Sequence, residues 1–259
     1  MAADARKPFR FTTKELSRRT FVDFERFFSQ VHGCMCVLYS LGGHIPKPGR
    51  TAKEIAEQLG DPDRSKKRFP LQEWRRQQES RAMKELVWKG QAHGILVYAD
   101  GEPVGWCQYG RTSELPVVGP KKAPERLFAK DPTSEWRITC FTTRMDHRRR
   151  GVATIALEAA VEAIRKRGGG WIEALPIVFG HYDPELRELR RTYGWRSEEV
   201  KEYLKSWPVK DVPGIGPVQA AELTPRTAPH FGVMSMFERL GFVPTQRNGQ
   251  AGVVMRLKV

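Results

Sequence analysis

The sequence predicts a mixed α/β fold (α+β), in which helices cover a β-sheet. Residues 136–143 are rich in β-branched and aromatic side chains, and residues 171–177 form a second run of this kind, so both are expected to be strands. Between them, apolar residues recur three and four positions apart over residues 152–164, which is the pattern of a helix with one buried face. A strand, a helix and a second strand therefore form the centre of the predicted fold.

The length of the chain bounds its domain organisation. A chain of 259 residues can form one large domain or two small ones. We expect a single domain over residues 1–259, with a helical N-terminal part over 1–93 and an insertion at about 178–228.

The N-terminal part is predicted to be helical. Thr12 and Glu15 have the spacing of a capping box, and apolar residues follow at helical spacing, so we expect a helix over 13–30. A short helix is expected over 51–60, after a loop rich in glycine and proline, and a long helix over 71–88.

Strand patterns lie on both sides of the central helix. Residues 95–98 and 104–108 are joined by an Asp-Gly turn and predict a hairpin. Residues 111–132 contain four prolines and are expected to be mostly loop. The last strand is expected over 253–259, where every second residue is apolar.

Composition and charge narrow the class of protein. The chain is 40% hydrophobic and 29% charged, as in an ordinary soluble protein, and has no apolar run of about 18 residues that would predict a membrane span. The N-terminus lacks the apolar segment of a secretory signal, and four scattered cysteines do not predict a disulfide framework, so we expect the cytoplasm. The formal net charge of +14 attracts polyanions, which include nucleic acid, acidic proteins and phosphorylated cofactors.

The cysteines do not predict a metal site. Cys34 and Cys36 form a C-x-C pair, but no second pair follows it, and a structural zinc needs four well-spaced ligands. Reduced, mostly buried thiols are the favoured interpretation, and no metal is expected.

The six residues from Arg148 to Ala153 lie where a predicted strand turns into the central helix. Gly151 lets the backbone approach a ligand closely, and the free N–H groups of the first helical turn then point at that ligand. The helix dipole makes the preferred ligand an anion, and the neighbouring arginines add positive charge. This arrangement predicts a cradle for a phosphate or pyrophosphate group.

The pattern differs from the two commonest phosphate loops, because G-x-x-x-x-G-K-[ST] and G-x-G-x-x-G are both missing here. It reads R-x-x-G-x-A, formed by Arg148, Gly151 and Ala153, and resembles the acyl-CoA pyrophosphate loop of the GNAT superfamily of N-acetyltransferases. Two further landmarks have the expected order. The hairpin over 96–106 resembles the early hairpin of that superfamily, and residues 236–242 resemble its helix that ends in Gly-Phe before the final strand.

The resemblance implies a GNAT fold, with a mixed, mostly antiparallel central sheet, a splayed pair of parallel strands and flanking helices. It also implies acetyl-CoA as co-substrate, with its pantetheine arm between the splayed strands and its pyrophosphate on the N–H groups at the start of the helix. At least one of the three arginines is expected to reach the 3′-phosphate. The residues expected to bind the cofactor are Phe141, Thr142, Thr143, Arg148, Arg149, Arg150, Gly151, Val152, Ala153 and Thr154.

The implied reaction is direct attack of a neutral amine on the thioester carbonyl, with a backbone N–H of the first central strand stabilising the oxyanion. Glu135 is the first candidate for the general base and Glu173 the second, although either could be a solvent-facing strand residue. The position where many members have a tyrosine general acid is Phe237, which cannot donate a proton. Ser235, His230 or water are the candidates that remain for protonating the thiolate.

The insertion departs from the superfamily, where this connection is often much shorter. It is expected to hold two or three short helices, including 197–207, and to form either a wall or lid of the acceptor site or a surface insertion that only packs on the domain. Within it, residues 212–223 resemble the hairpin of helix-hairpin-helix DNA-binding motifs, although a plain helix N-terminus explains the same residues.

Two classes of function remain. The favoured one is an acetyl-CoA-dependent N-acetyltransferase acting on a primary amine. The alternative is a GNAT-fold, nucleic-acid-associated binding module with weak or no acyltransferase activity, which Phe237 and the positive charge favour. The sequence leaves the acceptor, the acyl chain preference and the oligomeric state open, and predicts no membrane partner.

Overall fold

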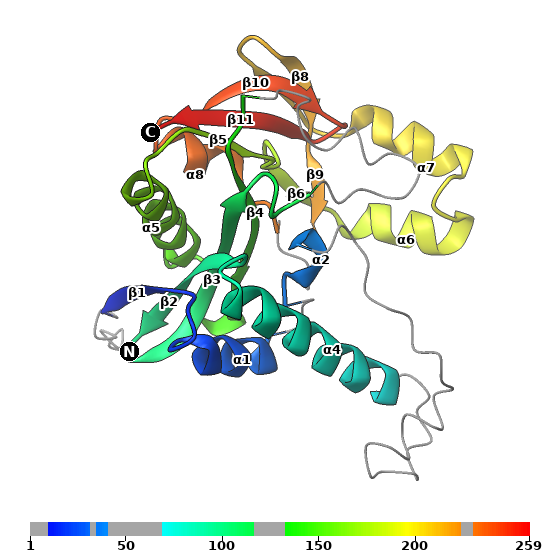
Figure 1. Cartoon of the computed structure of the whole chain (residues 1–259). Coiled ribbons are helices and arrows are strands. Elements are labelled where there is room, and N and C mark those ends of the chain that lie inside the picture. The colour runs from blue at the N-terminus through cyan, green and yellow to red at the C-terminus, as the bar shows by residue number, and fades with distance from the viewer. Residues whose placement is uncertain (1–9, 32–34, 41–68, 117–132, 224–229) are drawn as a thin grey trace, which may run out of the picture.

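The computed structural model describes residues 10–31, 35–40, 69–116, 133–223 and 230–259, whose arrangement is shown in Figure 1. Its centre is a seven-stranded sheet in the order β1-β2-β3-β4-β5-β11-β10. Neighbouring strands are antiparallel except for the parallel pair β4 and β5, so the predicted fold class is confirmed. The strands are β1 (Phe11–Glu15), β2 (His93–Ala99), β3 (Glu102–Arg111), β4 (Trp136–Thr143), β5 (Trp171–Ala174), β10 (Val243–Asn248) and β11 (Gly252–Lys258).

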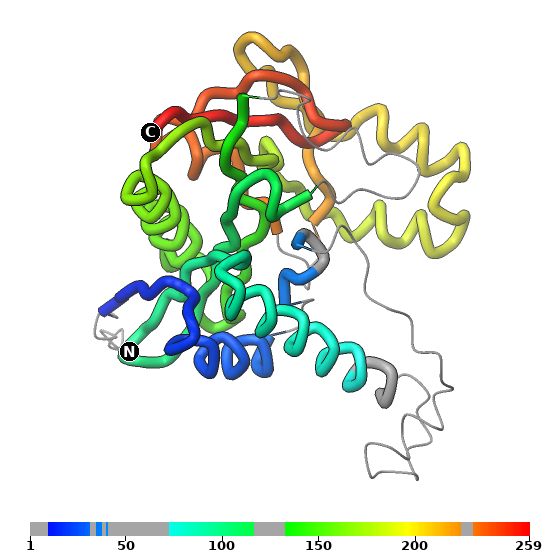
Figure 2. The backbone as a smooth tube through the Cα atoms, viewed as in Figure 1, coloured from blue at the N-terminus to red at the C-terminus, as the bar shows by residue number. Residues whose placement is uncertain are grey.

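Helices cover both faces of this sheet. Consecutive residues of a strand point to opposite faces, so Ile95 and Leu96 of β2 enter two different hydrophobic cores. The Ile95 core receives the apolar faces of α5 (Val152–Lys166) and α8 (Met234–Glu238). The Leu96 core receives those of α1 (Phe21–Gln30) and α4 (Phe69–Trp88), with Phe24 packed edge-on against Trp106. The short helix α2 (Val37–Ser40) lies on the same side, and Figure 2 traces the backbone through these elements.

The predicted helix over 13–30 is wrong over residues 13–20. Thr12 and Glu15 belong to β1, where they pair with Tyr98 and Ile95 of β2. The helix α1 begins only at Phe21, after a turn in which the Thr20 hydroxyl donates to the Glu15 carbonyl at 2.8 Å. Pairing with a distant strand therefore outweighs the local capping pattern.

The other elements agree more closely with the prediction. The helix over 71–88, the hairpin and the strand over 136–143 are confirmed, whereas β5 ends at Ala174, earlier than expected. The predicted helix over 51–60, and the loop before it, lie outside the described residues. None of the described helices combines the length and the apolar character needed to cross a bilayer.

The insertion contains the expected helices and also four strands. Its helices are α6 (Pro184–Tyr193), α7 (Glu198–Tyr203) and the 3-10 turn η3 (Leu204–Ser206). They enclose a small cluster of their own, which contains Leu186, Val200 and Trp207. The strands are β6 (Gly180–Tyr182), β7 (Val209–Val212), β8 (Gly216–Gln219) and β9 (Ala221–Leu223).

Neither interpretation of residues 212–223 survives. β7 and β8 pair as an antiparallel hairpin, and the two glycines at its turn have φ of 75° and 87°, a left-handed backbone that favours glycine. No helix follows the turn, so the helix-hairpin-helix motif and the helix N-terminus are both wrong. Val212 and Val218 instead pack into the Ile95 core, the main core of the protein, which fixes this hairpin to the sheet.

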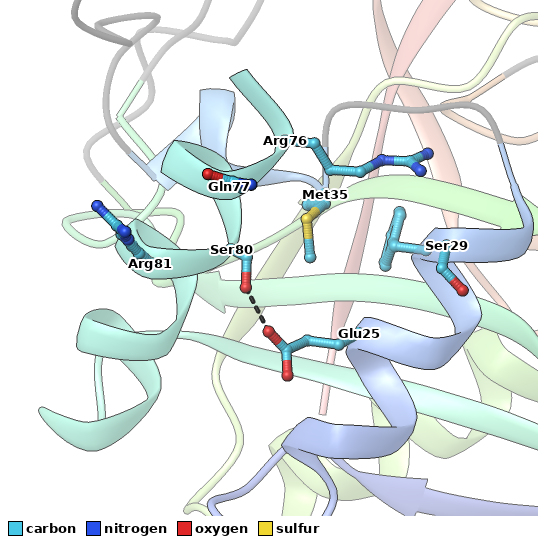
Figure 3. A pocket seen from close by; sticks show the side chains of 8 residues that line it. Glu25, Ser29, Met35, Arg76, Gln77, Ser80 and Arg81 are labelled. Atoms are coloured by element: carbon cyan, nitrogen blue, oxygen red, sulfur yellow. Dashed lines mark hydrogen bonds between the residues drawn. The ribbon is translucent and has the colours of Figure 1, made fainter. Parts of the chain in front are cut away.

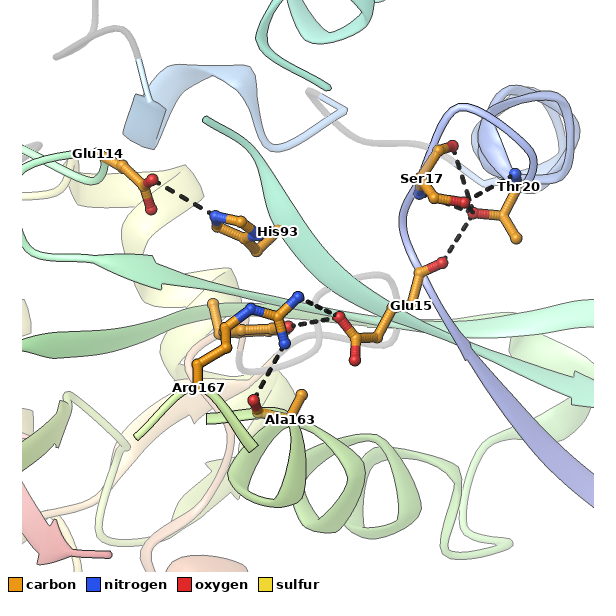
Figure 4. A network of polar contacts seen from close by, with 8 residues as sticks. Glu15, Ser17, Thr20, His93, Glu114, Ala163 and Arg167 are labelled. Carbon is orange, nitrogen blue, oxygen red and sulfur yellow. Dashed lines mark hydrogen bonds and ion pairs between the residues drawn. The ribbon is translucent and has the colours of Figure 1, made fainter. Parts of the chain in front are cut away.

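A polar network joins β1, β3 and the end of α5 (Figure 4). A Glu15 carboxylate oxygen accepts hydrogen bonds from Arg167 at 2.6 Å and from the Tyr109 hydroxyl at 3.1 Å. Arg167 also donates to the Ala163 carbonyl at 3.0 Å. Burial raises the pKa of Glu15, but the hydrogen bond and charge of Arg167 outweigh this effect, so the pKa is lowered from its usual value.

We expect Glu15→Gln to lower the free energy of unfolding near neutral pH by less than about 1 kcal/mol, because the ion pair is partly exposed. The folded-state pKa lies below the unfolded one, so this stabilisation is present above the unfolded pKa and is lost as the pH falls through the folded pKa. Chemical denaturation of both proteins at pH 7 and at about pH 3 should show the difference shrinking in acid. A difference that grows in acid would contradict the assignment.

Candidate functional site

The parallel strands β4 and β5 separate part-way along their length. They pair at three positions, from Trp136 and Ile172 to Ile138 and Ala174. Thr139 then has no partner on β3 and forms a bulge, because Gln108 pairs with Cys140 and Tyr109 with Ile138. Beyond the bulge β4 continues to Thr143, while β5 has already ended.

The chain itself bridges the opening between the two strands. The Phe141 N–H donates to the His230 carbonyl at 2.6 Å, and the Ile177 N–H donates to the Gly232 carbonyl at 3.2 Å. Val233 also forms a parallel bridge with Ile177. The amide that the resemblance assigns to the pantetheine arm is therefore already hydrogen-bonded within the protein.

A cavity of about 410 Å³ lies next to this opening, between the end of β4, the start of α5 and α8. Eight of the ten residues predicted to bind the cofactor line it, whereas Thr142 and Arg150 do not. The eight are Phe141, Thr143, Arg148, Arg149, Gly151, Val152, Ala153 and Thr154.

The start of α5 is open toward this cavity. Gly151 precedes the helix with φ 80° and ψ 0°, and the N–H groups of the first helical turn have no partner within the helix. A Cβ placed on Gly151 would meet no atom within 4 Å. Free N–H groups and the positive end of the helix dipole therefore face open space, where they favour an anion.

Close packing on the sheet fixes the position of this helix start. A Cβ placed on Gly105 of β3 would lie 2.3 Å from Cγ1 of Val152, the first residue of α5. Only a glycine at position 105 lets the helix start approach β3 so closely.

The charge of the cavity lining is entirely positive or neutral. Among the described residues, no aspartate or glutamate lines it, whereas Arg148, Arg149 and Arg239 do. Within the described residues, these three guanidinium groups have no hydrogen-bond or ion-pair partner. The nearby Arg144 differs, since Asp146 and Gln30 hold it.

His147 is the remaining ionisable group of the lining. It is buried, and its Nδ1 lies 2.9 Å from a carboxylate oxygen of Asp146. The hydrogen bonds from Arg144, together with the close approach of the His147 ring, hold the pKa of Asp146 well below its usual range. Asp146 therefore stays ionised and neutralises Arg144 rather than the arginines of the cavity.

Residues 61–178 match the family model described as Acetyltransferase (GNAT) family. The resemblance to the GNAT superfamily is confirmed. The match covers the described elements from α4 to β5, including the open helix start, and stops before α8. It supports an acyltransferase activity.

Solved GNAT structures were also found at low identity. An acetyltransferase from Thermus thermophilus is 12% identical, with a TM-score of 0.40, and the comparison covers 97% of this chain and 99% of that one. The PaiA N-acetyltransferase from Thermoplasma acidophilum, solved in complex with coenzyme A, is 8% identical, with a TM-score of 0.40 and coverage of 96% and 99%. These likenesses are too distant to transfer an activity. The search of curated proteins found no match.

The predicted catalytic residues of this GNAT-like chain lie in different places. Ser235 lines the cavity from α8. His230 touches the site through its backbone carbonyl, and its side chain is exposed. Glu135 precedes β4 at the end opposite Phe141, roughly 20 Å away along the strand, where it pairs with Arg111 at 3.6 Å. The structure therefore brings two of the three to the opening.

Two further residues from the sequence analysis are buried. Glu173 is fully buried beside Arg137, whose Nε lies 2.5 Å from one carboxylate oxygen, so it is not a solvent-facing strand residue. Phe237 is also fully buried, with its ring between those of Phe141 at 5.9 Å and Phe242 at 5.2 Å. Its ring is core, and it does not line the cavity.

Apart from Ser235, sequence analysis did not predict the residues that line the cavity from α8 and the segment before it. His147, Gly232, Val233, Met236 and Arg239 line it without having been predicted. Four of these belong to α8 or its approach, which a contact far along the sequence brings to β4. Within the described part of the insertion, no residue lines this cavity, and its helices pack around a cluster of their own. The predicted wall or lid of the acceptor site stays a prediction.

A second cavity of about 290 Å³ lies between α1 and α4, on the other face of the sheet (Figure 3). Its one carboxylate, Glu25, accepts a hydrogen bond from the Ser80 hydroxyl, and Arg76 donates to the Val31 carbonyl. No group of three or more metal-ligating side chains gathers among the described residues. Of these two cavities, the one at α5 offers an anionic ligand the arginines without partners among the described residues.

Proposed function

We propose that this protein is an acetyl-CoA-dependent N-acetyltransferase that moves an acetyl group to a primary amine by direct attack in a ternary complex. The observation that carries the proposal is the cavity in which three arginines and an open helix start converge, with no acidic lining residue and no partner for these arginines in the part of the chain that the structure describes. Such a site suits the pyrophosphate of coenzyme A, because guanidinium and backbone N–H groups both bind phosphate oxygens.

The proposed pose places the pyrophosphate at Gly151 and the thioester near Phe141. The backbone N–H of Phe141, which donates to the His230 carbonyl in this structure, would exchange that partner for the oxyanion that forms when the amine attacks. The nitrogen gains the acyl bond, the carbon–sulfur bond breaks, and the ammonium proton passes to a base or to water. The thiolate of a thiol with an ordinary pKa of about 8.5 can leave without a proton donor.

The catalytic assignments are part of the proposal. Ser235 lies on the cavity wall and is proposed to relay a proton from water to the thiolate, taking a proton from the water as it gives one up, with His230 as the alternative at the mouth of the strand opening. Glu135 lies at the far end of β4 and would act only through a chain of water molecules. We expect Ser235→Ala to turn over more slowly than the wild type and to bind acetyl-CoA with the same affinity.

The location and domain organisation are also proposed from the sequence. We place the protein in the cytoplasm, as a single domain over 1–259 with an insertion at about 178–228. The hairpin of β7 and β8 supports one domain, because its valines share the main core.

Calorimetric titration of acetyl-CoA into the purified protein, followed by an assay of thiol release with a panel of primary amines, tests the proposal. We expect a 1:1 complex and release of free CoA thiol with at least one amine. Absence of acetyl-CoA binding would overturn it.

The alternative is a GNAT-fold module that associates with nucleic acid. Two observations favour it, the net charge of +14 and the buried Phe237 where many GNAT members place an acidic hydroxyl. Binding of oligonucleotides with a steep salt dependence, in a protein that does not bind acetyl-CoA, would support this alternative.

A further inference from the structure

The three unpaired arginines of the cavity stand on two different walls. Arg148 and Arg149 precede α5, beside the open helix start. Arg239 follows α8, on the wall that the sequence analysis did not predict. The positive charge of the lining is therefore divided between two arginines before α5 and one arginine after α8.

Coenzyme A carries its negative charge in two separate groups. The pyrophosphate bridges the adenosine and the pantetheine arm, and a 3′-phosphate hangs from the ribose. A phosphate monoester has a second pKa of about 6, so the 3′-phosphate bears close to two negative charges at neutral pH. Each of the two groups needs its own donors once bound.

The donors for the pyrophosphate lie at the start of α5, where free N–H groups stand beside Arg148 and Arg149. Arg239 is exposed. Within the described residues, it has no ion-pair or hydrogen-bond partner and no carboxylate lines the cavity beside it. A guanidinium presents paired N–H donors that match a phosphate monoester.

We propose that Arg239 is the residue that recognises the 3′-phosphate of the coenzyme. This inference rests on the proposed function and revises the sequence-based expectation that Arg148, Arg149 or Arg150 reaches this group. It makes α8 the wall that distinguishes coenzyme A from ligands with the same pyrophosphate and arm but no 3′-phosphate.

The test compares acetyl-CoA with 3′-dephospho-acetyl-CoA by calorimetry. We expect the wild type to bind acetyl-CoA at least about tenfold more tightly, which is the range for a hydrogen bond between charged partners. Arg239→Gln should bind the two ligands equally, at the affinity that the wild type has for the dephospho form. Thermal unfolding of the variant should match the wild type, because the side chain is exposed.

Two matched variants complete the design, and both change the net charge by the same amount. Arg148→Gln should weaken both ligands by the same factor, and Arg187→Gln, on α6 away from the cavity, should weaken neither. If Arg239→Gln keeps the preference for acetyl-CoA, or weakens both ligands equally, the inference is overturned while the proposed function stands. If the wild type binds neither ligand, the proposed function is overturned and the inference with it.

Discussion

Gly151→Glu is expected to abolish binding of acetyl-CoA, with a loss of at least about a hundredfold. The substitution puts a carboxylate at the position where the free N–H groups of α5 and the unpaired arginines favour an anion. It adds repulsion toward the pyrophosphate and supplies the arginines with an internal partner, so both effects act against the ligand. Titration of acetyl-CoA into the variant measures the loss.

The fold should tolerate this substitution. A Cβ at position 151 meets nothing within 4 Å, and the cost is the left-handed backbone of a non-glycine residue, about 1 kcal/mol. Gly151→Gln is the matched control, because it has the same backbone strain and nearly the same shape but no charge. Equal losses for the two variants would mean that shape rather than charge governs binding, and would contradict the anion cradle.

Gly105→Ala is expected to destabilise the protein by about 1–3 kcal/mol and to weaken acetyl-CoA binding as well. The new methyl group would lie 2.3 Å from Cγ1 of Val152 and 3.3 Å from Cβ of Val97, so the start of α5 has to move away from β3. Displacing the helix start moves the N–H groups that face the cavity. Thermal unfolding and calorimetry, run on the same preparations, measure the two effects.

A second substitution separates this mechanism from a general loss of stability. Val152→Ala removes the methyl groups that the new Cβ would strike. The double variant should therefore be more stable than the sum of the two single losses predicts, since contacting residues are not additive. Purely additive losses would show that Val152 is not the residue that gives way.

Short-range patterns predicted the elements that carry the cradle. The strand over 136–143, Gly151 and the helix after it are consecutive in the chain, so residue type and spacing suffice to place them. The helix over 13–30 was wrong at its start because β1 depends on pairing with β2, which lies far along the sequence. The helix-hairpin-helix interpretation failed for a similar reason, since packing of Val212 and Val218 into the main core holds the segment as a β-hairpin.

In the candidate site, too, residues close together in the sequence could be predicted and residues brought in by distant packing could not. The wall formed by Arg148, Arg149 and Gly151 could be predicted, because its chemistry is local. Arg239 could not, because only the packing of α8 against β4 brings it to the cavity. The sequence did contain one signal for this wall, the helix ending in Gly-Phe, but it identified the element without showing which of its side chains faces the ligand.

In the proposed pose, the acyl oxygen of the ligand and the His230 carbonyl compete for one donor, the Phe141 amide. A ligand that uses this amide exchanges one carbonyl oxygen for another, so the net change in hydrogen bonding is smaller than the contribution of one typical hydrogen bond, about 0.5–1.5 kcal/mol. An acyl thioester carries such an oxygen, whereas free coenzyme A has a thiol in its place. Once the acyl group has left, the chain can reclaim its amide, and this exchange would favour release of the spent cofactor over retention.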